Sequence, residues 1–123
     1  MKLVILEPLG VEQEKLLALA EEKLTDRVEI EAYDTRVTDA DALAERAKDA
    51  DIVVLSNLPF RREVMERCPN LKMISVAFTG VDHVDMDYCR ERGILVSNCA
   101  GYSTTAVSEL VFGLALGLYR RII

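Results

Sequence analysis

Five short apolar runs alternate along this sequence with five segments of helical periodicity, and this alternation constrains the fold more than any other feature. The apolar runs span residues 2–6, 27–34, 51–57, 71–78 and 94–98. The segments whose apolar residues recur every three or four positions span residues 11–24, 38–50, 61–68, 85–93 and 103–122. Strands joined by helices run parallel, because the helix returns the chain to the starting edge of the sheet. We therefore expect an α/β protein with a parallel, five-stranded sheet.

The composition of individual runs predicts their order in the sheet. "KLVIL" and "DIVVLSN" are almost continuously apolar, as expected for central strands that helices cover on both faces. "RVEIEAYD" alternates apolar and polar residues, which indicates an edge strand with one wetter face. Right-handed crossovers then put helices on both sides of the sheet. The simplest arrangement is the flavodoxin-like one: three layers, doubly wound, with strand order 2-1-3-4-5.

The 123 residues are enough for one domain with a sizeable core but not for two. We expect residues 1–123 to form that single domain, since no linker or low-complexity segment interrupts them. The expected helix N-caps are Thr38 or Asp39, Asp85, and Ser103 or Thr104. Gly93 stands where a left-handed residue would end the fourth helix.

The charge pattern argues against several partners. The formal net charge is −6 and no basic cluster is longer than a pair, so we expect no nucleic-acid partner. Met1 and Lys2 lead into only four apolar residues before Glu7, which argues against a signal peptide. The uncharged run Leu110–Tyr119 in the last helix is far shorter than the ~20 residues that span a bilayer. A cytoplasmic protein without a membrane partner is expected.

The cysteines fit the same compartment. Cys68, Cys89 and Cys99 are odd in number and lack C-x-x-C spacing, so we expect reduced thiols, buried or half-buried. A metal site is not expected, because His83 is the only histidine and so the only imidazole ligand.

Ligand sites in such folds gather beyond the carboxyl ends of the strands. A phosphorelay receiver would need an acidic pair, an aspartate and a lysine there, where this sequence has Glu7-Pro8, Ser56-Asn57 and Ser97-Asn98. A flavodoxin would need a hydroxyl-rich phosphate loop after the first strand, but "EPLGVEQ" holds two acids and no Ser or Thr. Neither G-x-G-x-x-G nor G-x-x-x-x-G-K-[ST] occurs. Receivers, flavodoxins and the common nucleotide loops are therefore excluded.

The Thr79-Gly80 pair remains as a candidate site, at the end of the fourth apolar run. Gly80 has no Cβ, so a ligand can approach its N–H closely. Successive free N–H groups at such a turn form a small concavity that suits a carboxylate. The alternative is that Gly80 only makes the turn.

The segment that contains this pair also carries a family resemblance. Residues Leu71–Arg121 read "LKMISVAFTGVDHVDMDYCRERGILVSNCAGYSTTAVSELVFGLALGLYRR". This stretch resembles the D-isomer-specific 2-hydroxyacid dehydrogenases, with a strand, G-x-D-[NH]-[VI]-D, a helix ending in R-G-I, V-x-N, and S-T-x-A-V-[AS]-E before a long apolar helix. The earlier "DADIVVLSNLPFRREVMERCPNLK" is similar to the same family, so the resemblance covers most of the chain.

The resemblance implies that the chain is the substrate-binding, flavodoxin-like domain of such a dehydrogenase, truncated before the NAD-binding domain. The backbone N–H groups of Thr79 and Gly80 would then hold the substrate's carboxylate. Thr79 would also lie near the nicotinamide of the cofactor, and Val107 would line the nicotinamide pocket. Leu58 and Pro59 would wall the pocket for the substrate's side chain.

One departure from the family pattern limits what is implied. Many members carry an arginine two or three residues before the Thr-Gly pair, where this chain has Val76 and Ala77. From this domain the carboxylate would therefore meet backbone donors alone, and the substrate is left as an unspecified small 2-hydroxy or 2-oxo acid. His83 matches the Asn/His position that helps to structure the loop, so we interpret it as a loop residue bonded to backbone rather than as a catalytic base.

The family's catalytic machinery follows the long helix, in a Rossmann domain with G-x-G-x-x-G, an arginine and a Glu-His pair. The chain ends at Ile123 without them. We therefore expect no catalytic residue in this chain, no cofactor bound by it alone, no activity in isolation, and NAD or NADP in the parent oxidoreductase. The alternative is a stand-alone binding or interaction domain with the same fold. In either case small carboxylates should bind weakly.

The last helix is apolar nearly all round, so it must be buried on more than one side. It could fold back on its own sheet, or it could pair with another copy, where Gly113 and Gly117 would let two backbones approach. We expect a homodimer through the helix Ser103–Ile122, by direct packing or by exchange of helices.

Overall fold

A parallel five-stranded sheet organises the protein, and its order is β2-β1-β3-β4-β5. The structure is a computed structural model that describes residues 1–24 and 27–122. The strands are β1 (Lys2–Ile5), β2 (Glu29–Ala32), β3 (Ile52–Leu55), β4 (Met73–Val76) and β5 (Leu95–Asn98). The helices are α1 (Gln13–Leu24), α2 (Ala40–Ala47), α3 (Arg62–Met65), α4 (Met86–Arg92) and α5 (Thr104–Arg120). The expected fold class and strand order are confirmed.

Local sequence explains where several helices begin and end. The side chain of Asp39 accepts a hydrogen bond from the N–H of Ala42 at the start of α2. Asp85 accepts from the N–H of Tyr88 at the start of α4, and Gly93 ends that helix with φ 67°. Ser103 holds the N-cap position of α5, but its side chain makes no capping hydrogen bond.

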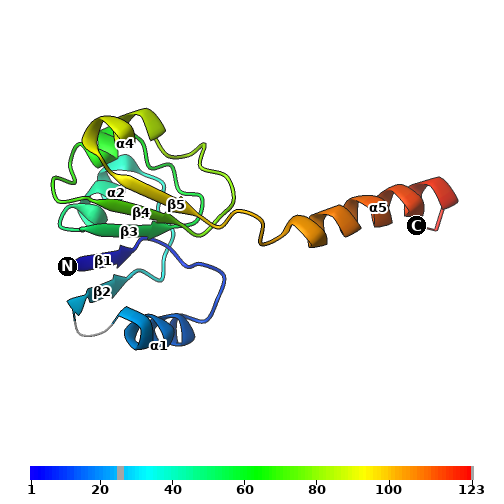
Figure 1. The fold of residues 1–123 in the computed structure, drawn as a ribbon, viewed down its shortest axis with the longest axis horizontal. Coiled ribbons are helices and arrows are strands. Elements are labelled where there is room, and N and C mark those ends of the chain that lie inside the picture. Colours follow the sequence, from blue (N-terminus) through cyan, green and yellow to red (C-terminus); the bar gives the residue numbers. More distant parts are fainter. Residues whose placement is uncertain (25–26, 123) are drawn as a thin grey trace.

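The hydrophobic core lies on one face of the sheet, where α2, α3 and α4 cover it. Val53, Leu55, Ile74 and Val76 of the central strands are fully buried there. Moving from β2 across to β5, each right-handed crossover places its helix on this face. The β1–β2 crossover runs in the opposite direction, so α1 lies on the other side of the sheet (Figure 1).

On that other face, the side chains of the strands become more exposed from β1 towards β5. Leu3 and Ile5 of β1 are buried, while Ile52 and Met73 of the next strands are half-buried. Leu95 of β5, in register with Met73, exposes 69% of its surface. The reason is that α5, which would complete this layer in a flavodoxin-like monomer, points away from the sheet.

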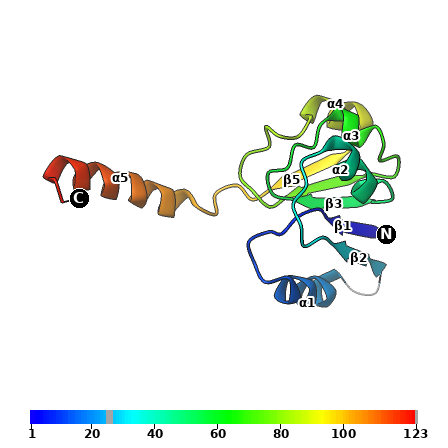
Figure 2. The same ribbon diagram turned by 180° about the vertical axis from the view of Figure 1, so that it is seen from behind.

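Helix α5 extends from the body of the protein into solvent, joined to β5 only by a short connection (Figures 1 and 2). None of its residues is buried, although nearly every side is apolar. Of the two expected placements, folding back on its own sheet is therefore not what the structure adopts. Within residues 1–24 and 27–122, no helix combines the length and apolar character needed to cross a bilayer.

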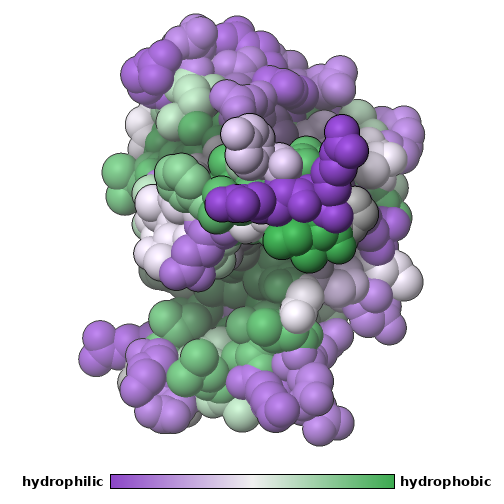
Figure 3. All heavy atoms as spheres, turned by 90° about the vertical axis from the view of Figure 1, so that its right-hand side faces the viewer, coloured by the Kyte–Doolittle hydropathy of each residue, from purple (hydrophilic) through white to green (hydrophobic). Residues whose placement is uncertain are grey.

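An apolar hollow lies below the N-terminal end of α5. Figure 3 views the molecule from the α5 end and shows hydrophobic side chains gathered in a recess above α1. Helix α1 has no buried residue of its own, and Leu19 on it is 54% exposed. The helical layer on this face therefore covers less of the sheet than the layer formed by α2, α3 and α4.

Two of the cysteines are buried as expected, and one is not. Cys68 and Cys89 lie in the core, and burial raises the pKa of Cys68 to about 11 and raises that of Cys89 as well. Cys99 is exposed, contrary to the expectation, because it follows β5 at the uncovered end of the sheet. All three thiols are free.

Candidate functional site

The Thr79-Gly80 turn follows β4 at the carboxyl edge of the sheet, as the sequence predicts. The side-chain amide of Asn98 donates to the Thr79 carbonyl at 2.7 Å. The Thr79 hydroxyl donates to the Cys99 carbonyl at 3.4 Å, and the Cys99 N–H donates to the Phe78 carbonyl at 3.0 Å. Residues at the end of β5 thus hold the turn by the carbonyl groups of Phe78 and Thr79 and by the Thr79 hydroxyl. The N–H groups of Thr79 and Gly80 take no part in these bonds.

The N–H groups of Thr79 and Gly80 have no acceptor among residues 1–24 and 27–122. Thr79 is exposed and Gly80 is half-exposed, so a ligand can reach both. The geometry also weakens the view that Gly80 only makes the turn. A Cβ built there would meet only the Asp82 carboxylate, at an ordinary 3.5 Å, and φ is not in the left-handed region. The fold would accept alanine, so the missing Cβ matters more for what approaches from outside.

The loop after β3 runs alongside this turn and contains the two residues expected to wall the substrate pocket. Leu58 is fully buried in the core, whereas Pro59 is exposed. The N–H of Phe60 donates to the His83 carbonyl at 2.9 Å, and the N–H of Asp85 donates to the Phe60 carbonyl at 3.4 Å. Pro59 therefore presents its side chain at the surface, while Leu58 supports the loop from behind.

Glu7 is a buried carboxylate at the same edge, immediately after β1. It is 1% exposed and is the only buried charged side chain in the described part of the chain. One carboxylate oxygen accepts the N–H groups of Ser56 (2.8 Å) and Asn57 (3.2 Å). The other forms an ion pair with Arg36, which follows β2. Glu7 thus joins segments that follow three different strands.

His83 lies between the turn and α4, and its imidazole Nε2 is buried without a hydrogen-bond partner in the described residues. Burial, followed by the positive charge of Arg61, lowers the pKa of His83 below its ordinary 6.5. Asp82, Glu7 and a backbone hydrogen bond with Ser56 act in the opposite direction. This placement agrees with a loop residue bonded to backbone.

Protonation of His83 should destabilise the fold. Because its pKa is lower folded than unfolded, the unfolded chain takes up the proton first as the pH falls. The free energy of unfolding should therefore decrease between about pH 7.5 and 5.5, and His83→Asn should lose less over that interval. Urea unfolding of both proteins at the two pH values measures the difference. Equal losses in the two proteins would contradict this role.

Val107 lies in the first turns of α5 and is 54% exposed. Its N–H donates to the Ser103 carbonyl at 2.9 Å, which is an ordinary helical bond. The connection that includes Cys99 links this helix to the Thr79 turn. The structure thus brings Leu58, Pro59, Thr79 and Gly80 to one edge of the sheet, with Leu58 turned inwards, whereas Val107 lies on α5, which extends away from that edge (Figure 1).

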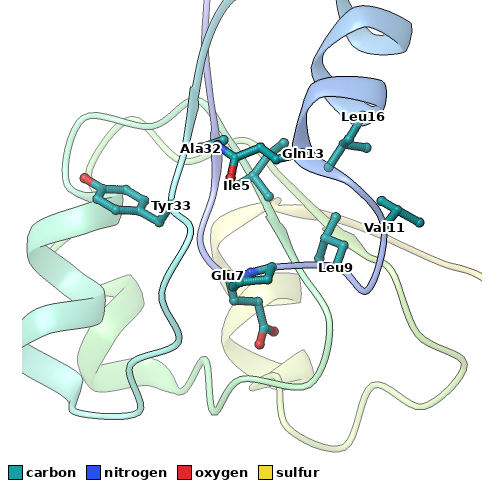
Figure 4. Close-up of a pocket in the computed structure, with 9 residues that line it drawn as sticks. Ile5, Glu7, Leu9, Val11, Gln13, Leu16, Ala32 and Tyr33 are labelled. Carbon is teal, nitrogen blue, oxygen red and sulfur yellow. The ribbon is translucent and has the colours of Figure 1, made fainter.

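A separate small hollow of about 30 Å³ lies between α1 and the β1–β2 edge. Figure 4 shows Leu9, Val11 and Leu16 on one side of it, with the Glu7 carboxylate turned away from them. None of the predicted substrate residues lines this hollow, so it reflects the loose packing of α1 rather than the candidate site. Nowhere in the described ranges do three His, Cys, Asp or Glu side chains converge as metal ligands would.

Two residues of this edge were not identified from the sequence as parts of the site. Asn98 supports the Thr79 carbonyl, and the V-x-N motif was a signal that could have found it. Glu7 was considered only as an acid that argues against a signal peptide, a receiver site and a phosphate loop. Its position directly after a fully apolar strand was the available signal for a buried carboxylate.

Comparison with known proteins gives one consistent result. Residues 3–114 match the family model described as "D-isomer specific 2-hydroxyacid dehydrogenase, catalytic domain". A hydroxypyruvate reductase of Blautia hydrogenotrophica is 36% identical over 121 residues, covering 94% of this chain and 35% of the reductase.

Solved structures agree over almost the whole chain. The TT0316 protein of Thermus thermophilus is 30% identical, with a TM-score of 0.81 over 99% of this chain and 38% of that protein. The D-lactate dehydrogenase of Aquifex aeolicus, solved with NAD and lactic acid, is 28% identical with a TM-score of 0.73 over 99% of this chain and 34% of the dehydrogenase. The chain spans little more than a third of each of these relatives.

Proposed function

The chain belongs to the D-isomer specific 2-hydroxyacid dehydrogenases, and from this premise we propose that its Thr79-Gly80 turn binds the carboxylate of a small 2-hydroxy or 2-oxo acid. The observation that carries the proposal is the pair of N–H groups at this turn, which have no acceptor in the described chain and belong to an exposed and a half-exposed residue. The relatives' names, hydroxypyruvate reductase and D-lactate dehydrogenase, support acids of this class.

Each residue has a distinct part in this proposal. Thr79 and Gly80 donate to the carboxylate, and the tether from Asn98 orients the peptide between them. Pro59 borders the substrate's side chain, and Leu58 holds that loop against the core. The Asp82 carboxylate close to Gly80 opposes a bound anion, which keeps affinity low.

A nicotinamide cofactor, NAD or NADP, would supply or accept the hydride. Thr79 and Val107 are exposed and fit contacts with the nicotinamide end alone, because the sequence has no glycine-rich fingerprint for the phosphates. We therefore propose that this chain positions the acid and that, on its own, it neither holds the cofactor nor transfers hydride.

Titrating glyoxylate or oxamate into the chain should move the backbone amide resonances of residues 78–83, with a dissociation constant of about 1 mM or weaker. Two hydrogen bonds worth ~1 kcal/mol each cannot offset the association entropy by much. Gly80→Ala should abolish these shifts while unfolding at nearly the same urea concentration, because its Cβ has room inside the fold.

The control is Glu21→Ala on α1, an exposed position away from both the Thr79-Gly80 turn and α5. It should bind the acids as the unaltered chain does. Shifts centred outside residues 78–83 would contradict the site. Micromolar affinity would contradict the energetic argument.

We also propose a second copy of this chain as the partner of α5. A helix that is apolar nearly all round and has no buried residue is unusual for a stable monomer. The uncovered face near Leu95 offers a complementary surface on the same chain. A dimer could therefore form by packing two α5 helices together or by exchanging them onto each other's sheets. The free thiols support the cytoplasm as the compartment.

A further inference from the structure

The topological switch point of this sheet lies between β1 and β3, because the chain runs from β1 outwards to β2 and then returns past β1. Open α/β sheets bind ligands in the crevice at this point. Here the crevice is filled by the chain itself. The Glu7 carboxylate accepts the N–H groups of Ser56 and Asn57, which are the donors that a bound anion would otherwise use.

A carboxylate at 1% exposure needs its charge and lone pairs satisfied, because an unpaired buried charge is strongly destabilising. Arg36 supplies the opposite charge, and the two N–H groups satisfy the second oxygen. The position of Ser56 and Asn57 is therefore coupled to Glu7. If these residues move, the carboxylate loses the donors that make its burial tolerable.

The same loop is fixed at its other end by the segment that follows the substrate turn. Phe60 bonds to the backbone on both sides of Val84, and the two residues form a parallel bridge. The loop Ser56–Phe60 is thus held by Glu7 at its start and by residues 83–85 at its end. Between these two attachments lies Pro59, and residues 83–85 begin three positions after Gly80.

We infer that Glu7 is a positioning residue that sets the loop Ser56–Phe60 against the Thr79-Gly80 turn and so shapes the acid-binding site without touching the acid. This inference rests on the proposed function for the choice of ligand. The structural link from Glu7 through the loop to the turn does not depend on the ligand and can be tested in the ligand-free protein. Loss of the Glu7 charge should alter the site more than an equal loss of stability elsewhere does.

The test compares Glu7→Gln with Leu71→Ala. Leu71 is buried and precedes β4 at the opposite edge of the sheet, so its truncation destabilises the fold far from the site. Without ligand, Glu7→Gln should shift the amide resonances of Ser56, Asn57, Phe60 and Gly80 and speed their hydrogen exchange beyond the change seen in Leu71→Ala. With oxamate, it should weaken binding by about fivefold, as expected for the loss of one net hydrogen bond.

The outcomes separate the inference from the proposed function. If the unaltered chain binds oxamate at residues 78–83 and Glu7→Gln binds it equally well, the positioning role is overturned. If the unaltered chain shows no shift at residues 78–83, the proposed function fails, and the ligand-free spectra still decide whether Glu7 controls Gly80. Should Glu7→Gln not fold, Glu7→Asp keeps the charge for Arg36 but shortens its reach, and the same shifts at Asn57 and Gly80 are expected.

Discussion

Leu114→Glu should sediment as a 13.8 kDa monomer under conditions where the unaltered chain sediments at twice that mass. Leu114 lies in the middle of α5, a helix of 17 residues that is about 26 Å long and has no buried side chain. In a symmetric pair every substituted position occurs twice, so each dimer would bury two uncompensated carboxylates. Sedimentation at micromolar concentration measures the change directly.

The matched control is Thr105→Glu, which adds the same charge to an exposed, polar position in the first turn of α5. A negative charge there is favourable for the helix and should leave the mass of the dimer unchanged. A monomer for the unaltered chain would rule out the partner proposed for α5. A dimer that survives Leu114→Glu would place the interface elsewhere.

Phe60→Ala should destabilise the fold by about 3–5 kcal/mol, a large share of the roughly 5–15 kcal/mol typical of a domain. Phe60 is fully buried, and its backbone bridges to Val84 next to the candidate site. Truncation removes the ring and leaves a cavity between the two loops, which the backbone bridge prevents from collapsing. Urea unfolding followed by circular dichroism gives the difference in free energy of unfolding.

Phe78→Ala provides the comparison, because Phe78 lies at the same edge of the sheet but is 39% exposed. It should cost about 1–2 kcal/mol, less than Phe60→Ala, because more than a third of its surface is already in contact with water. Equal losses for the two variants would show that the loop around Phe60 is not part of the cooperative core.

The features that were predicted from sequence alone depend on interactions between residues close in the sequence or on general rules for α/β sheets. Asp39 and Asp85 cap their helices because each side chain reaches an N–H three residues away, and Gly93 adopts the left-handed conformation within its own turn. The strand order followed from apolar runs and crossover handedness, which need no knowledge of distant contacts. Each of these predictions uses interactions within a few residues or a rule that applies to every α/β sheet.

The placement of α5 was not predictable in the same way. The apolar stripe of an amphipathic helix predicts which face is buried. Helix α5 is apolar on nearly all sides, so its sequence does not predict which side packs against the protein. Cys99 was expected to be at least half-buried, and its exposure follows from the same missing cover. The sequence predicted that the helix is buried on more than one side, but it did not identify the surface that covers it.

The contacts of Glu7 could not be predicted for a different reason. Its partners Ser56 and Asn57 are 49 and 50 positions away, and their N–H groups carry no side-chain signal. Only the three-dimensional adjacency of β1 and β3 brings donors and acceptor together. Buried charge–backbone contacts of this kind are therefore recognised from structure.

The position of α5 outside the core has a consequence for the order in which the protein folds. The buried residues of the core cluster lie between Val4 and Ile94, and β4 pairs with β3 while β5 pairs with β4. Contacts between such neighbours close short loops, which favours rapid folding. During synthesis, the sheet can therefore reach its final packing as soon as Asn98, the last residue of β5, leaves the ribosome. Helix α5 then leaves the ribosome next to a body that is already folded, so the second copy that we propose as its partner would bind it in a separate, later step of assembly.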